Sequence, residues 1–247
     1  MDSGTFRELR HRIGYPDAAM PEERDWYTLQ PGYTPVEFAG DPARRAALGW
    51  PADADPPEAW RRSATLSAHP MLLRDGLTGR PLNPAGPTGI TGHGRLRLLG
   101  PNPTADGVVT LGDGGHARVL LIERRDTGQP AFPGGFCDVG PDGAFEHPLR
   151  TALREVYEET GVVVRAGAVQ LLHRGVATNS LRNTDNAWIE NTAYHVRLPA
   201  DAGQAHEPVG RDDALTAGWF RVADLDPARM SDTHAANLLR LRALLAR

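Results

Sequence analysis

The segment from Gly140 to Val162, which reads GPDGAFEHPLRTALREVYEETGV, constrains this chain more than any other. A helix turns by about 100° per residue, so Glu155, Glu158 and Glu159, spaced i, i+3 and i+4, lie on one helical face. Carboxylates at that spacing repel one another, and a bound cation would remove the cost. Mg²⁺ or Mn²⁺ would suit the position because hard cations prefer oxygen ligands. The segment therefore predicts a helix that carries a divalent metal site.

Apolar residues recur at helical spacing on the other side of the same segment. They are Leu149, Ala152, Leu153 and Val156. Such a stripe packs on a hydrophobic core and leaves the glutamates facing outward. Both ends are marked, because Pro148 suits the first turn of a helix and Gly161 suits a left-handed C-terminal cap.

At these residues the sequence resembles the Nudix hydrolases, whose signature is G-x5-E-x7-R-E-U-x-E-E-x-G-U, where U is a bulky aliphatic residue. Every fixed position is filled, by Gly140, Glu146, Arg154, Glu155, Val156, Glu158, Glu159, Gly161 and Val162. The resemblance implies an enzyme that hydrolyses a nucleoside diphosphate with Mg²⁺ or Mn²⁺, and it implies Glu155, Glu158 and Glu159 as metal ligands. The alternative is a charged, solvated surface helix.

The turn before the motif departs from the family pattern. Nudix proteins usually begin the motif at the second glycine of a Pro-Gly-Gly turn, and here the turn Pro133-Gly134-Gly135 stands five residues earlier. Either Gly140 takes over the role of that glycine, or an insertion bulges out of the turn. We expect Gly135 to supply the backbone carbonyl that completes the metal site, with Gly140 as the alternative.

The resemblance also implies roles for residues around the metal ligands. Glu146 would bind metal through water or shape the local field, and Arg154 would orient a glutamate by an ion pair. Arg154 could instead be a solvated helix residue. The general base often lies outside the motif in this family, and Glu190, Asp212 and Asp213 are the candidates. Each could equally be an exposed loop carboxylate.

A second resemblance is to the mitochondrial-type ADP-ribose pyrophosphatases, a group that includes the ADP-ribose-sensing domain of a melastatin-type cation channel. The segments that carry it are RPLNPAGPTGITG, LLGPNPTADGVVT, RNTDNAWIE at residues 182–190, and the N-terminal pattern of Tyr15-Pro16, Trp26, Tyr33 and Phe38. Two departures concern substrate contacts: Pro87 stands where the group has a basic residue, and GRWGPN is reduced to RLLGPN.

This resemblance implies hydrolysis of ADP-ribose to AMP and ribose 5-phosphate. For substrate contacts we favour Arg182, Asn183, Asp185 and Asn186, because a loop dense in short polar side chains suits ribose hydroxyls and phosphate. The alternative is an Asx-turn that holds its own backbone.

Two other functions stay open. A related pyrophosphatase could act on NAD, NADH or a modified NAD-derived dinucleotide, with the contacts around Pro87 selecting that substrate. A catalytically silent ADP-ribose-binding module is the third possibility, and the intact glutamates of the motif speak against it.

Residues 1–105 are rich in Pro and Gly but contain aromatic anchors, which disordered regions usually lack. The anchors are Trp26, Tyr27, Tyr33, Phe38, Trp50 and Trp60. We expect an ordered, loop-rich N-terminal lobe with one short helix near residues 57–66. Tight turns should follow over residues 75–102.

Residues 106–247 form the expected catalytic domain. Short apolar segments typical of strands lie at residues 107–112, 118–125, 169–177, 191–198 and 217–222. A terminal helix over residues 234–247 is amphipathic through Leu238, Leu239, Leu241, Leu244 and Leu245. Strands and helices in this order indicate an α/β fold, a sandwich with a mixed sheet between helical layers, as in the Nudix fold.

Composition limits the partners and the compartment. The net charge of −4 gives no reason to expect nucleic acid or a membrane surface as a partner. The lone Cys137 excludes an internal disulfide and fits a reducing compartment. No apolar run approaches about 20 residues, and the start lacks the apolar region of a signal peptide, so we expect a cytoplasmic protein.

Overall fold

A computed structural model describes residues 3–22, 24–28, 32–50, 57–69, 72–164, 168–199 and 207–247. The chain forms two compact units. Unit 1 comprises Met1–Pro103 and Gly175–Glu190, and unit 2 comprises Thr104–Arg174 and Asn191–Arg247. Residues 175–190 fall within the catalytic domain expected from the sequence, yet they belong to unit 1.

Unit 1 contains more regular structure than the sequence indicated. Its elements are α1 (Ser3–Arg12), β1 (Val36–Glu37), α2 (Pro42–Ala47), α3 (Pro57–Ala64) and β2 (Ile90–Thr91). The helix expected near residues 57–66 is α3, whereas α1 and α2 were not expected. Strands β1 and β2 form a parallel pair that joins the N-terminal residues to the turn-rich segment.

Helix α1 escapes notice in the sequence because its buried face includes an arginine. Phe6 and Arg10 are one turn apart and only 7% and 4% exposed. The Arg10 guanidinium donates to the carbonyl oxygens of Thr88 (3.0 Å) and Asn183 (2.6 Å). It also lies over the rings of Phe6 and Tyr15. Arg10 thus takes a buried position on the helix. An apolar residue at that position would have completed the hydrophobic periodicity by which a helix is recognised in a sequence.

The aromatic residues anchor the loops of unit 1 as expected, with one exception. Trp60 is buried. The Trp26 indole donates to the carbonyl of Asn83 at 2.7 Å, and the Tyr33 hydroxyl donates to the Asp185 carboxylate at 2.6 Å. Tyr27 is 81% exposed, so the expectation that it is an anchor is wrong.

Strands β3 to β9 form one seven-stranded sheet with the order β5-β4-β3-β8-β7, in which β6 also pairs with β3 and β9 with β4. The strands are β3 (Gly100–Leu111), β4 (Arg118–Arg124), β5 (Pro130–Ala131), β6 (Gly134–Phe136), β7 (Ala168–Val176), β8 (Ala187–Leu198) and β9 (Ala214–Arg221). The helices of unit 2 are α4 (Pro148–Thr160) and α6 (Asp232–Leu245), with short 3₁₀ turns η1 (Gly114–His116), η2 (Val222–Asp224) and η3 (Pro227–Arg229).

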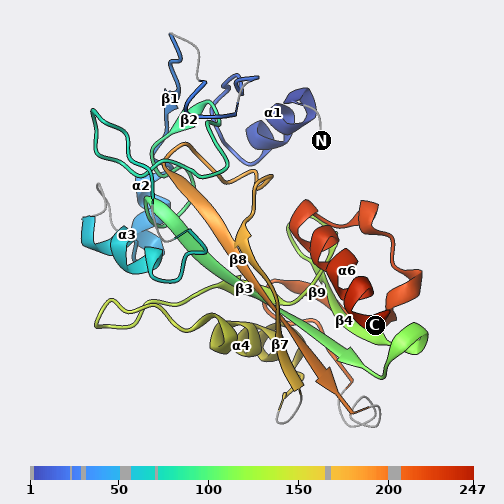
Figure 1. Cartoon of the computed structure of the whole chain (residues 1–247). Helices are drawn as coiled ribbons and strands as arrows, with labels where there is room; N and C mark the ends of the chain where they lie inside the picture. Colours follow the sequence, from blue (N-terminus) through green and yellow to red (C-terminus); the bar gives the residue numbers. More distant parts are fainter. Residues whose placement is uncertain are drawn as a thin grey trace. The chain divides into compact units, whose positions relative to one another are not determined.

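Two hydrophobic cores cover the two faces of this sheet. Val108 of β3 packs in one core with Leu238 and Leu241 of α6, whereas its neighbour Val109 packs in the other core with Val156 of α4. Successive strand residues point to opposite faces, so α6 and α4 cover opposite sides. Figure 1 shows the two helices on either side of the strands. Unit 2 is therefore a three-layered α/β/α sandwich.

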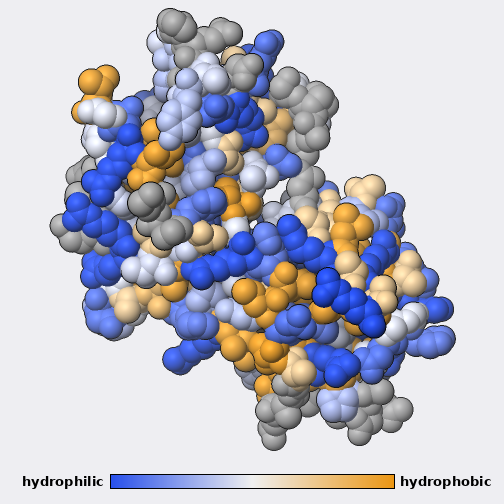
Figure 2. Space-filling model, in the orientation of Figure 1, coloured by the Kyte–Doolittle hydropathy of each residue, from blue (hydrophilic) through white to orange (hydrophobic). Residues whose placement is uncertain are grey.

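The terminal helix differs from expectation at one residue. Leu238 and Leu241 are fully buried, but Leu239 is 55% exposed because it lies off the stripe that faces the sheet. Other apolar side chains are also exposed, including Leu171 of β7 and Phe220 of β9. Figure 2 accordingly shows hydrophobic residues among hydrophilic ones on the visible face. None of the described helices has the length and apolar character needed to span a bilayer.

Candidate functional site

Helix α4 has the ends expected from the sequence. Pro148 opens the first turn, and the His147 side chain caps the helix by accepting from the backbone N–H of Leu149 at 3.2 Å. Gly161 ends the helix in the left-handed conformation with φ of 72°. Both expected boundary residues are confirmed, and they fix which residues of the motif share a helical face.

Arg154 lies at the centre of the carboxylates of the motif. Its Nη1 donates to Glu155 Oε1 and to Glu158 Oε2, both at 2.8 Å. Its Nε donates to Glu146 Oε2 at 3.1 Å, and its Nη2 donates to the carbonyl of Phe136 at 3.2 Å. Burial lowers the pKa of Arg154, but the hydrogen bond to Glu146 and the charge of Glu155 outweigh it and raise the pKa. Arg154 is thus the permanent cation of this cluster, and the alternative of a solvated helix residue does not describe it.

The three expected metal ligands differ in burial. The side chain of Glu158 is 42% exposed and that of Glu155 is 13% exposed, whereas Glu159 as a residue is only 4% exposed. The expectation that all three face outward is therefore wrong for Glu159, whose Oε2 accepts from the backbone N–H of Gly134 at 3.0 Å. Burial raises the pKa of Glu159 to about 8, with the charge of Glu155 adding to the effect. Burial also raises the pKa of Glu155.

The Pro-Gly-Gly turn packs tightly between β3 and α4. Gly134 pairs with Asp106 and Gly135 with Ala105 in the antiparallel β3–β6 register. A Cβ at Gly135 would overlap the Glu155 carboxylate, and one at Gly134 would overlap the Asp106 carboxylate and the Ala105 carbonyl oxygen. Only glycine therefore leaves room for a carboxylate on each side of this strand.

The extra residues between this turn and Glu146 form a small hairpin-like loop. Val139 and Phe145 form an isolated β-bridge, and the Glu146 N–H donates to the carbonyl of Asp138 at 2.7 Å. Gly140 lies in the tight turn of this loop, where its N–H donates to the carbonyl of Ala144. The insertion thus bulges out while Gly135 stays against Glu155, which favours Gly135 over Gly140 as the glycine next to the ligands.

The loop supplies a carboxylate that the sequence analysis missed. Asp138 Oδ2 lies 3.6 Å from Arg154 Nε, and its side chain is 74% exposed. An acidic residue within the lengthened segment was the only available signal, because the loop conformation that places it beside Arg154 could not be deduced. Cys137, just before it, is buried, as expected of a small core or loop residue.

A buried polar network lies on the α6 side of β3 and was also missed. Asp106 Oδ2 lies 3.5 Å from Asn237 Nδ2 and 3.6 Å from His234 Nδ1. Asn237 in turn lies 3.4 Å from Asn191, which donates to Thr104. Burial raises the pKa of Asp106 to about 7. The signal in the sequence was an aspartate at the start of the apolar run GVVTL, where an acidic residue needs a specific reason.

Asp212 and Asp213, two of the three candidate bases, directly follow a segment that is hydrogen-bonded to the C-terminal end of α4. The backbone N–H groups of Val209 and Arg211 donate to the carbonyls of Thr160 and Glu159, at 3.0 and 2.9 Å. This segment continues directly into Asp212 and Asp213, which are exposed. The negative charge of Asp213 contributes to the raised pKa of Glu159, so Asp213 interacts electrostatically with the buried glutamate of the site.

Glu190, the third candidate, is a buried anchor of unit 1. Its carboxylate accepts from the Ser67 hydroxyl at 2.6 Å, the Ala68 N–H at 2.8 Å and the Trp188 indole at 3.1 Å. These donors hold both carboxylate oxygens of Glu190, which is only 3% exposed. A carboxylate so engaged is poorly placed to accept a proton from water.

The residues expected to contact substrate are also engaged within unit 1. The Asn183 side chain donates to the carbonyl of Ala177 and accepts from the Ile189 N–H. The Asp185 carboxylate accepts from the Tyr33 hydroxyl, and from both the N–H and the hydroxyl of Thr88. Asp185 thus holds segments that are far apart in the chain, and Asn183 joins residues six positions away on either side, so both reach beyond the local Asx-turn weighed as the alternative.

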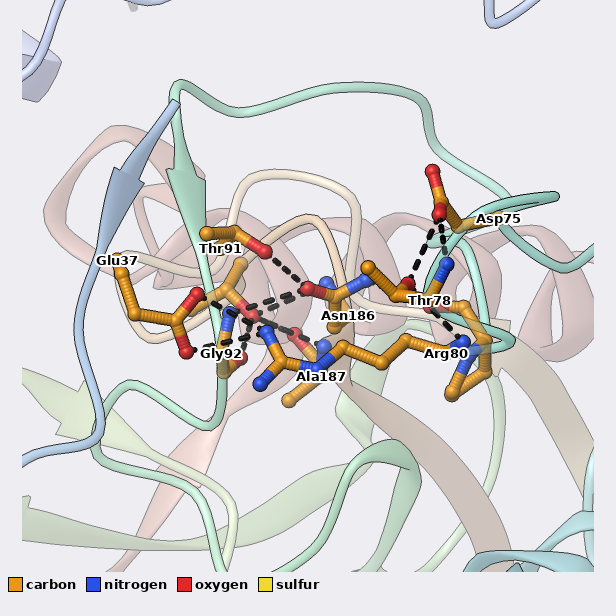
Figure 3. A network of polar contacts seen from close by, with 10 residues as sticks. Glu37, Asp75, Thr78, Arg80, Thr91, Gly92, Asn186 and Ala187 are labelled. Atoms are coloured by element: carbon orange, nitrogen blue, oxygen red, sulfur yellow. Dashed lines mark hydrogen bonds and ion pairs between the residues drawn. The ribbon is translucent and has the colours of Figure 1, made fainter. Parts of the chain in front are cut away.

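Asn186 and Arg182 complete this loop. The Asn186 amide oxygen accepts from the Thr91 hydroxyl and the Gly92 N–H, and its nitrogen donates to the carbonyl of Pro81 at 3.0 Å. Figure 3 shows Asn186 pointing at Thr91 and Gly92. The carbonyl of Arg182 accepts from the Tyr15 hydroxyl at 2.7 Å. A substrate-binding role for these four residues stays a prediction.

The carboxylates of α4 fit a divalent cation in their chemistry. All donors are oxygens, and Glu155 and Glu158 already converge on a single positive nitrogen. Burial and mutual repulsion disfavour the charged forms of Glu155 and Glu159, which a divalent cation would relieve. Within the described ranges no three His, Cys, Asp or Glu side chains form a ready-made metal site. Arg154 Nη1 lies between two of the carboxylates, Glu155 and Glu158, at 2.8 Å from each.

The sandwich, with a glutamate-bearing helix docked beside a Pro-Gly-Gly turn, defines the Nudix class of α/β domain. Residues 101–241 match the model of the NUDIX domain. A Caenorhabditis elegans protein that bears the name "Putative nudix hydrolase 6" is 31% identical, over 93% of this chain and 90% of that protein. The chain belongs to the Nudix hydrolase family. The expected α/β fold with a mixed sheet, preceded by an N-terminal region, is confirmed.

Other similar proteins carry names that refer to ADP-ribose or to cation channels. The mitochondrial ADP-ribose pyrophosphatase of Rattus norvegicus is 30% identical over 59% of this chain and 49% of its own length. A transient receptor potential cation channel, subfamily M member-like 2, of Nematostella vectensis is 32% identical over 62% of this chain and 11% of its own length. Among solved structures, the NUDIX domain of Shewanella oneidensis NrtR with ADP ribose matches at 20% identity, with a TM-score of 0.46, over 60% of this chain and 90% of that one.

Proposed function

We propose that this Nudix hydrolase cleaves the pyrophosphate of ADP-ribose to AMP and ribose 5-phosphate, with Mg²⁺ or Mn²⁺ held by Glu155, Glu158 and Glu159. The observation that carries the proposal is the complete carboxylate face of α4, arranged around Arg154 and against Gly134-Gly135. The similarity to a mitochondrial ADP-ribose pyrophosphatase supports the choice of substrate.

The chemistry follows from the charges involved. A pyrophosphate repels an attacking water, and a bound divalent cation would neutralise its oxygens and lower the pKa of that water. Before metal binds, the protein holds the carboxylates in place: Arg154 fixes Glu155 and Glu158, and the Gly134 N–H fixes Glu159. Asp213 is the base that we propose, because it is exposed beside the end of α4 and its charge acts on Glu159.

One observation favours a second substrate. Pro87 is buried and takes the position where the ADP-ribose group has a basic residue, so one charged contact expected for ADP-ribose is missing. The alternative is therefore a Nudix pyrophosphatase for NAD, NADH or a modified NAD-derived dinucleotide. A silent ADP-ribose-binding module is disfavoured because all the glutamates of the motif are present.

A product assay distinguishes these functions. The protein is incubated with Mg²⁺ and ADP-ribose, NAD, NADH, ADP-glucose or diadenosine polyphosphates, and the products are separated by chromatography. We expect ADP-ribose to be cleaved to AMP and ribose 5-phosphate, with a kcat/KM higher than that for any other compound in the assay. Preferred cleavage of NAD or NADH would establish the alternative, and tight ADP-ribose binding without turnover would establish the binding module.

A further inference from the structure

The guanidinium of Arg154 occupies carboxylates that the proposed function assigns to a metal ion. An arginine has five N–H donors, and acceptors surround all three nitrogens of this one. Nη1 serves Glu155 and Glu158, Nε serves Glu146, and Nη2 lies 3.2 Å from the carbonyl of Phe136 and 3.0 Å from Glu146. A cation bound at Glu155 and Glu158 therefore competes with Nη1 for the lone pairs of these carboxylates and repels the guanidinium.

The Asp138 carboxylate lies close to the same guanidinium. Its Oδ2 is 3.6 Å from Nε, which is too far for a hydrogen bond but close enough for charge attraction. The side chain is 74% exposed, so solvent reaches its carboxylate. The backbone around it is fixed, because the Glu146 N–H donates to its carbonyl and Val139 bridges Phe145 directly after it.

We propose that Asp138 receives the Arg154 guanidinium when a divalent cation binds Glu155 and Glu158, an inference that rests on the proposed function. A partly buried guanidinium is destabilised when its hydrogen bonds to Glu155 and Glu158 weaken, and Asp138 supplies a further charged acceptor after a short shift. An interaction that is stronger in the metal-bound state strengthens metal binding by the same amount. Asp138 is thus a positioning residue that raises metal affinity without contacting the metal.

Mn²⁺ titration by calorimetry tests this role in four proteins: wild type, Asp138→Asn, Arg154→Gln and the double variant. In the presence of Arg154, Asp138→Asn should weaken Mn²⁺ affinity by about three- to tenfold. In the Arg154→Gln background the same substitution should change the affinity by less than about twofold. Equal weakening in both backgrounds would mean that Asp138 is itself a ligand and would overturn the inference, as would no weakening in either.

A matched control distinguishes the specific position of Asp138 from the general loss of a negative charge in the loop. Asp142→Asn removes a carboxylate from the same loop, and an asparagine there can still accept from the Ala144 N–H. It should leave Mn²⁺ affinity unchanged, and a loss equal to that of Asp138→Asn would overturn the inference. If Arg154→Gln does not fold by circular dichroism, Arg154→Lys replaces it, because lysine cannot bridge the same set of acceptors.

The outcomes also separate this inference from the proposed function. Wild-type protein that binds Mn²⁺, with no effect of Asp138→Asn, overturns the role of Asp138 alone. Wild-type protein that binds no Mn²⁺ overturns the proposed metal site and the role of Asp138 with it.

Discussion

Nη1 of Arg154 lies 2.8 Å from both Glu155 Oε1 and Glu158 Oε2, so one nitrogen joins two carboxylates that would otherwise repel each other. The side chain of Arg154 is 24% exposed, and that of Glu155 is 13% exposed. Arg154 therefore stabilises the folded helix before any metal binds, and it sets the separation of two expected ligands.

Replacing Arg154 by lysine should lower the free energy of unfolding by about 1–3 kcal/mol, because a lysine cannot hold three carboxylates and a carbonyl at once. Urea unfolding in the presence of a chelator measures the change. Arg150→Lys is the control, because the Arg150 side chain is 84% exposed and makes a single ion pair among the described residues, with Glu146 at 3.5 Å. It should shift stability by less than about 0.5 kcal/mol, and equal effects of the two variants would contradict the central place of Arg154.

Alanine substitutions in the Pro-Gly-Gly turn should have different effects at its two glycines. At Gly135 the new Cβ meets the end of the flexible Glu155 side chain, so the protein should fold but lose at least about tenfold in kcat/KM. At Gly134 the Cβ also meets the Ala105 carbonyl oxygen at 2.6 Å, so thermal stability should fall.

Gly115→Ala is the control for both glycine variants, because nothing lies within 4 Å of its Cβ position. Turnover by Gly135→Ala at the rate of Gly115→Ala would show that the fit between Gly135 and Glu155 is unimportant.

His234 should make the fold sensitive to acid. Burial, and next the charge of Arg124, lower its pKa to about 4, below the ordinary value of 6.5. Between pH 6.5 and pH 4 the unfolded chain binds a proton at this residue that the folded protein does not. The contribution of His234 to the free energy of unfolding should therefore fall by about 2 kcal/mol from pH 7 to pH 5.

Urea unfolding of wild type and His234→Asn at both pH values isolates this contribution. The comparison is needed because Asp106 lies 3.6 Å away, and its raised pKa changes stability in the opposite direction over this range. A stability difference between the two proteins that does not depend on pH would contradict a neutral, largely buried His234.

Glu190 and Asp213 should respond differently to the loss of their charge. Glu190→Gln places an amide where three donors converge, so it should lower the free energy of unfolding by about 1–3 kcal/mol. Asp213→Asn, at an exposed position, should leave stability unchanged and lower kcat at least about 100-fold. Urea unfolding and steady-state kinetics on both variants measure the contrast. A large loss of kcat in stable Glu190→Gln would transfer the role of base to Glu190.

Local patterns in the sequence predicted the parts of the structure that depend on neighbours in the chain. The spacing of Ala152 and Val156 gave the buried face of α4, and Gly161 gave its end. Strands β4 and β9 were likewise visible as short apolar runs. These features follow from periodicity and capping, which a single segment carries by itself.

The remaining features depend on pairings across the chain. Asn186 lies next to Thr91 and Gly92, nearly a hundred positions away, and Glu190 accepts from Ser67. The burial of Glu159 depends on where Gly134 packs. A polar residue that holds a distant loop and one that binds substrate look alike in a sequence, because both need short side chains with hydrogen-bonding atoms.

The most direct test of a metal-dependent pyrophosphatase is the rate of AMP release from ADP-ribose with Mg²⁺, for wild type and for Glu158→Gln combined with Glu159→Gln. Circular dichroism confirms that both proteins are folded. The wild type should release AMP, and the double variant should be at least about 100-fold slower. Equal turnover by the two folded proteins would contradict the assignment of the metal site to α4.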